Sequence, residues 1–108
     1  MGAAEERTHM AFDLERFMDT RFDVADDVIF EKQEGFVIVN DNRHSTIFGL
    51  DPNASFFWEA LVADSTPRQT VAQVLAHCPA TEAEVVRDLA VLLKRWLELD
   101  LVVPRTDG

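Results

Sequence analysis

The sequence predicts an α+β fold in which a three-stranded antiparallel β-sheet is followed by three α-helices, an outline similar to a winged helix-turn-helix domain. Between Val28 and Leu50, three short β-prone runs alternate with turn residues. After Leu50, three helix-start signals each precede apolar residues at helical spacing. The 108 residues suffice for one such domain.

The three predicted strands follow one another with short turns between them. The first is Val-Ile-Phe at 28–30, and Glu-Gly at 34–35 marks the turn after it. The second is Phe-Val-Ile-Val at 36–39, and Asp-Asn at 41–42 marks the next turn. Ser-Thr-Ile-Phe at 45–48 is the third. Such spacing is typical of an antiparallel meander.

Each predicted helix has its own start signal. Asp51 before Pro52 begins the first, since Asp caps free N–H groups and proline loses nothing at the first helical position. Thr66 with Gln69 forms a capping box for the second helix. A third helix begins with the capping box at 81–84 and runs to about Leu99.

The third helix has an apolar arc wider than one surface needs. Its first stripe consists of Val85, Leu89, Leu92, Trp96 and Leu99. A second stripe beside it consists of Val86, Ala90, Leu93 and Leu97, with Arg87 and Lys94 at its flanks. At ~100° per residue the two span about 180°, against a little over 100° for a surface helix. Either the sheet and the N-terminal residues cover both stripes, or part of the second lines a groove for a partner.

The residues before the sheet are expected to form an N-terminal arm, 1–25, that is partly disordered or contains a short amphipathic helix. Leu14, Phe17 and Phe22 lie there among charges. The domain itself is expected at 26–104. Met10 is an alternative start.

The charge balance limits the classes of partner. Ten Lys and Arg face twenty Asp and Glu, which gives a net charge of −10. An acidic surface repels phosphate backbones and anionic lipid, so neither nucleic acid nor membrane is expected as the partner. Cys78 is the lone cysteine and agrees with a reducing cytoplasm.

No pattern of catalytic or metal-binding residues is found. His77 and Cys78 are adjacent, which is not a chelating spacing, and no second such pair exists. Four glycines form no phosphate-binding loop, and no Gly-x-Ser-x-Gly motif occurs. The chain is therefore expected to have no catalytic residue, no metal and no cofactor.

The segment from Val37 to Leu61 resembles the core of PqqD-like proteins, the recognition elements for ribosomally made precursor peptides. In that family a β-hairpin ends in a Leu-Asn/Asp-Pro turn, followed by a small residue and an aromatic-rich helix. The matching positions here are Leu50, Asp51, Pro52, Ala54 and Trp58. A Thr-rich helix start at 66–70 and a closing Leu-Val pair at 101–102 also match. The resemblance covers residues 27–103; the family's Gly after the first helix is missing at 62–65.

The resemblance implies a non-catalytic peptide chaperone in the cytoplasm. Such domains bind the leader segment of a precursor peptide and present it to a modifying enzyme such as a radical SAM, protease or cyclase component. The leader would add as a strand to the third strand and pack on the third helix. The backbone contacts would then come from Ser45, Thr46, Ile47 and Phe48. The side-chain site would be Val86, Arg87, Ala90, Leu93, Lys94 and Leu97.

Two other functions remain open. A winged-helix DNA-binding regulator has a similar outline, but its recognition helix should be basic. The predicted third helix is acidic on balance, with Arg87, Lys94 and Arg95 against four carboxylates. A structural or dimerisation subunit of a biosynthetic complex is the other alternative, because the apolar stripe and the arm could serve a homodimer.

Overall fold

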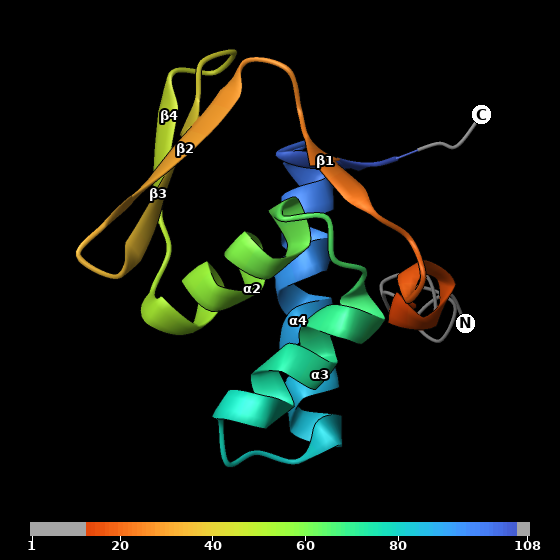
Figure 1. The fold of residues 1–108 in the computed structure, drawn as a ribbon. Coiled ribbons are helices and arrows are strands. Elements are labelled where there is room, and N and C mark those ends of the chain that lie inside the picture. The colour runs from red at the N-terminus through yellow and green to blue at the C-terminus, as the bar shows by residue number, and fades with distance from the viewer. Residues whose placement is uncertain (1–12, 106–108) are drawn as a thin grey trace, which may run out of the picture.

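The computed structural model describes residues 13–105 and confirms the predicted sheet followed by three helices. Strands β2 (Val28–Gln33), β3 (Phe36–Asp41) and β4 (Thr46–Gly49) pair antiparallel in that order. The sheet lies to one side of the helices, next to α2 (Figure 1).

The two turns of the sheet use left-handed backbone conformations. Glu34 and Gly35 have φ of 53° and 88° in the first turn. Ser45 has φ of 51°, so it belongs to the second turn and not to the third strand as predicted. An extended strand cannot include a residue with that φ, and β4 therefore begins at Thr46.

The second turn is organised by a buried carboxylate. The side chain of Asp41 is 3% exposed and accepts hydrogen bonds from Arg43 Nε at 2.9 Å and from His44 Nδ1 at 2.8 Å. The Arg43 guanidinium, followed by His44, lowers the pKa of this carboxyl far below its ordinary value. A charged aspartate is thus fixed at the corner between β3 and β4.

The three helices begin where the capping signals predict. α2 spans Pro52–Val62, and the Asp51 side chain accepts from the N–H of Ala54 at 2.7 Å. α3 (Pro67–His77) and α4 (Glu82–Glu98) both have complete capping boxes. Local side-chain chemistry is enough to define these starts.

The core lies between the inner face of the sheet and the helices. Val37 and Val39 of β3 are fully buried. Trp58 of α2 meets Trp96 of α4 edge to face, with ring centroids 5.1 Å apart, and Phe30 of β2 also contacts Trp58 edge to face at 5.6 Å. These aromatic contacts fix α4 relative to α2 and the sheet.

A second, two-stranded sheet was not predicted. β1 (Phe22–Val24) pairs antiparallel with β5 (Val102–Pro104), and Phe22 is buried. Arg105 ties this sheet to the loop after α2 through Asp23 at 2.8 Å and Asp64 at 2.6 Å. The predicted boundary at residue 26 therefore places β1 in the arm and its partner strand β5 in the domain.

The expected amphipathic helix of the arm corresponds to the short 3₁₀ helix η1 (Leu14–Phe17), whose Leu14 is buried. The first part of the arm, 1–12, lies outside the described residues.

Candidate functional site

The free edge of β4 is the first component of the site. Among residues 13–105, β4 pairs with β3 alone. Leu50 donates its N–H to the carbonyl of Val37 at 2.9 Å, which fixes the hydrogen-bonding phase of the ladder. Because residues alternate in an antiparallel pair, Thr46 and Phe48 direct their backbone groups to β3, while Ile47 and Gly49 direct theirs outward. Of the residues predicted to make backbone contacts, 45–48, Ile47 is therefore the strand residue whose N–H and C=O are available to a partner. Gly49, which lies outside the predicted range, is a second.

One hydrogen bond before β4 and one hollow after it relate the strand to the C-terminal half of α4. At the start of β4, Arg43 Nη2 donates to the backbone carbonyl of Asp100 at 2.8 Å, just beyond the end of α4. After the end of β4, a hollow of about 260 Å³ lies between the start of α2 and the middle of α4. It is lined by Asp51, Asn53, Ala54, Asp88, Val91 and Leu92. The strand and the helix therefore run in opposite directions, and we call the region between them, which ends in this hollow, the groove.

The flank of α4 that borders this groove is set by Asp88 and Leu92. At ~100° per residue, Arg95 and Leu99 lie on the same flank, one and two turns further along. Leu92 is half-buried, and Leu99 is exposed. Val91, at the rim, is 63% exposed. These residues give the groove a wall of three apolar side chains, one carboxylate and one guanidinium, which we call the Leu92 flank (Asp88, Val91, Leu92, Arg95, Leu99).

The side-chain site predicted from the sequence lies mostly on another side of the helix. Val86, Ala90 and Leu97 are half-buried against the core, about 120–160° around the helix from Leu92. Leu93 is wrong as a surface residue, because its side chain is 0% exposed and belongs to the core. The buried residues of α4 are Val85, Leu89, Leu93 and Trp96. Compared with the predicted first stripe, Leu93 takes the buried position that was expected for Leu92.

The two predicted basic residues do not border the groove either. Arg87 is exposed, and Lys94 forms an ion pair with Glu98 at 2.6 Å. Both are far around the helix from Leu92. Arg95 is the α4 cation on the Leu92 flank. The signal that could have identified this flank is the position of Asp88 and Arg95, two charges that border the first apolar stripe on one side.

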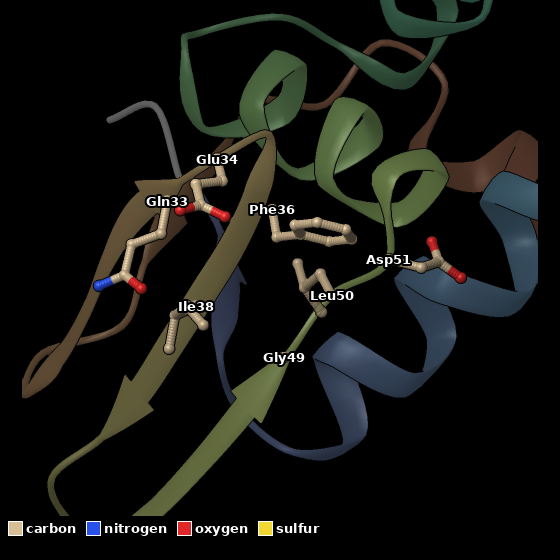
Figure 2. A pocket seen from close by; sticks show the side chains of 7 residues that line it. All are labelled: Gln33, Glu34, Phe36, Ile38, Gly49, Leu50 and Asp51. Carbon is tan, nitrogen blue, oxygen red and sulfur yellow. The ribbon is translucent and has the colours of Figure 1, made fainter.

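A second hollow, of about 520 Å³, adjoins the groove at the end of the sheet. Figure 2 shows Phe36 and Leu50 side by side at its base, Ile38 on the open face of β3, and α4 beyond the free edge of β4. Its full lining is Gln33, Glu34, Phe36, Ile38, Gly49, Leu50 and Asp51. Asp51 lines both hollows, so the groove continues around the end of β4 onto the sheet.

The described part of the chain offers hydrogen-bonding and apolar surface at this site. A group of three or more His, Cys, Asp or Glu placed to hold a metal ion does not occur within residues 13–105. The arrangement of an open strand edge beside an apolar helix flank is suited to binding an extended peptide. Across the same residues, every helix is too short or too polar to cross a membrane.

Comparison with known proteins identifies solved structures of the same fold. A solved structure described as TbiB1 in complex with the TbiA(beta) leader peptide is 25% identical to this chain, with a TM-score of 0.73. It covers 79% of this chain and 99% of its own. Lasso peptide synthetase B1 complexed with the leader peptide has the same fold, with a TM-score of 0.72 at 15% identity, covering 78% and 99%. The curated proteins gave no match.

The family comparison covers most of the sheet and all three helices. Residues 35–102 match the model for coenzyme PQQ synthesis protein D (PqqD). This range includes β3, β4 and the whole of α4, which are the elements that form the groove. The chain belongs to the PqqD family.

Proposed function

We propose that this protein binds the leader segment of a ribosomally synthesised precursor peptide and presents it to a modifying enzyme, without catalysing a reaction itself. The observation that carries the proposal is the free edge of β4 beside the Leu92 flank of α4. Family membership and the two leader-peptide complexes of the same fold support it.

The proposed mode of binding is strand addition to β4. Ile47 and Gly49 each offer an outward N–H and C=O, which a peptide strand satisfies with its own backbone groups. Side chains of the added strand alternate between two directions. Those facing the same way as Phe48 enter the groove against Leu92 and Leu99, and the others extend the open face of the sheet beside Ile47. The proposed leader therefore has apolar residues at every second position over one short segment.

The proposed contribution to biosynthesis is positioning. A chaperone that binds both the leader and an enzyme raises the effective concentration of the precursor at the active site, with no new chemistry. The enzyme is a radical SAM, protease or cyclase component. Because the precursor is made by ribosomes, the proposal places this step in the cytoplasm.

The charge of α4 argues against the DNA-binding alternative. Its Arg87, Lys94 and Arg95 are outnumbered by four carboxylates, Glu82, Glu84, Asp88 and Glu98. Lys94 is also engaged by Glu98. A recognition helix with this balance would repel the phosphate backbone.

The test is titration of the purified chain into a fluorescently labelled leader peptide encoded beside the gene, followed by anisotropy. We expect saturable binding that Leu92→Asp abolishes, because a carboxylate would then be buried against an apolar peptide side chain. Arg87→Ala, on a different side of α4, is the matched control and should bind like wild type. If the wild-type chain binds no precursor encoded nearby, the proposal is wrong.

A further inference from the structure

The outer face of the three-stranded sheet carries an exposed apolar cluster that extends from the leader edge at Ile47 across to β2. Ile29 of β2 is 57% exposed and Ile47 of β4 is 67% exposed. Both lie in register with Asn40 of β3, on its two sides, and Ile38 is the next outward residue along β3. We call these three isoleucines the isoleucine face. They surround a hollow of about 210 Å³, whose lining also includes Phe30, Glu31 and Asn40.

The charges around this face are acidic. Glu31 lines its hollow, and Glu34 lines the adjoining one, which shares Ile38. Neither hollow has Lys or Arg among its lining residues. Lys32 projects from the opposite face of the sheet and forms an ion pair with Glu59 of α2 at 3.4 Å. The chain as a whole carries a net charge of −10.

This charge distribution selects between two occupants. A second copy of the chain would bring one acidic rim against another, and like charges at close range oppose association. A partner that presents an apolar patch surrounded by Lys and Arg satisfies both the isoleucines and the rim. The isoleucine face therefore fits a different protein better than it fits itself.

The position of the face relative to the proposed peptide indicates which protein that is. A strand added to β4 places every second side chain on the same side of the sheet as Ile47. A protein seated on the isoleucine face would then also contact the outward side chains of the bound leader. Under the proposed function, the modifying enzyme is the protein that has to reach the bound leader.

We propose that the isoleucine face is the docking surface for the modifying enzyme, through an apolar patch with a basic rim on that enzyme. The inference rests on the proposed function and adds the surface and the chemistry of the partner. Ile29 and Glu31 lie on β2, two strands from the leader edge, so they separate enzyme docking from leader binding.

The test measures two affinities for each variant of the full-length chain. One is the affinity for the labelled leader; the other is that of the leader-loaded chain for the purified modifying enzyme encoded beside the gene, by titration calorimetry. We expect Ile29→Asp and Glu31→Lys each to weaken enzyme binding at least about tenfold while leader affinity stays within about twofold. Val103→Asp, at an exposed apolar position on β5, is the control and should change neither.

The outcomes distinguish the two proposals. Wild-type chain that binds the leader, with Ile29→Asp and Glu31→Lys binding the enzyme as wild type does, contradicts the docking inference alone. Failure of the wild-type chain to bind the leader contradicts the proposed function. Self-association by sedimentation that Ile29→Asp abolishes would assign the face to a second copy and also overturn the inference. Glu31→Lys, at an exposed position, keeps the test valid if Ile29→Asp lowers stability.

Discussion

Arg43 donates a hydrogen bond from Nη2 to the backbone carbonyl of Asp100 at 2.8 Å, across 57 residues of sequence. Asp100 has φ of 57° and ends α4 in a Schellman motif, in which Leu101 N–H donates to the Trp96 carbonyl at 2.9 Å. The same guanidinium is held by Asp41. This contact joins the turn before β4 to the end of α4, and it therefore sets the position of one wall of the groove relative to the other.

Arg43→Ala should weaken leader binding on the order of tenfold, the effect of losing roughly one positioned charged hydrogen bond. The free edge of β4 would then no longer be held at a fixed distance from α4. Leader anisotropy measures the effect, and Arg87→Ala, which removes the same charge from an exposed site, is the control. Equal affinities for the two variants would show that the Arg43 contact does not position the groove.

Leu92 and Leu93 should separate binding from stability. Leu92→Asp is expected to abolish leader binding with a small effect on the urea midpoint, because Leu92 is half-buried at the groove. Leu93→Ala is expected to lower the free energy of unfolding by about 2–5 kcal/mol, because it leaves a cavity at a fully buried position. Urea unfolding and leader anisotropy on both variants test this, and the opposite pattern would return the site to the Leu93 side of the helix.

Ile47→Pro should block strand addition while the sheet stays folded. Proline removes the N–H of residue 47, which points away from β3, and edge strands tolerate proline at such positions. Ile47→Ala keeps the N–H and serves as the control, with leader binding expected within a few-fold of wild type. Phe48→Pro removes an N–H directed to β3 and should instead unfold the edge. Near-normal leader binding by a folded Ile47→Pro variant would argue against pairing at this edge.

Asp41, in the turn between β3 and β4, should make the free energy of unfolding sensitive to acid. Arg43, followed by His44, lowers the pKa of the folded-state carboxyl below the ~3.9 of an unfolded aspartate. The stabilisation is therefore fully present above that value and is lost as the pH falls from about 4 through the lowered folded-state pKa. Urea midpoints between pH 7 and pH 3 should fall more steeply for wild type than for Asp41→Asn. Parallel curves for the two proteins would contradict this assignment.

The parts of the fold that the sequence predicts correctly are those with local causes. Asp51, Thr66 and Thr81 cap their helices through residues three positions away, so their effect is visible in the sequence alone. The order of the three strands follows from their short turns. The pairing of β1 with β5 depends on residues about 80 positions apart, such as Phe22 and Pro104, and no local pattern indicates it.

The helix face predicted from the sequence and the Leu92 flank differ, for a physical reason. The strand was identified, but its hydrogen-bonding phase depends on the left-handed φ of Ser45 and on the bond from Leu50 to Val37. The two helix faces differ because Leu92 and Leu93 both belong to one wide apolar arc. Which of them is buried depends on where Trp58 and the sheet contact α4, and periodicity along one helix cannot report that.

The most direct test of the central claim is amide hydrogen exchange of the ¹⁵N-labelled chain with and without the leader peptide encoded beside the gene. The ladder leaves the N–H groups of Ile47 and Gly49 unpaired in the free protein, while those of Phe48 and Leu50 already bond to β3. Strand addition predicts that saturating leader slows exchange at Ile47 and Gly49 by at least about tenfold, with little change at Phe48. Unchanged exchange at Ile47 and Gly49 in a leader-saturated sample would contradict binding at the β4 edge.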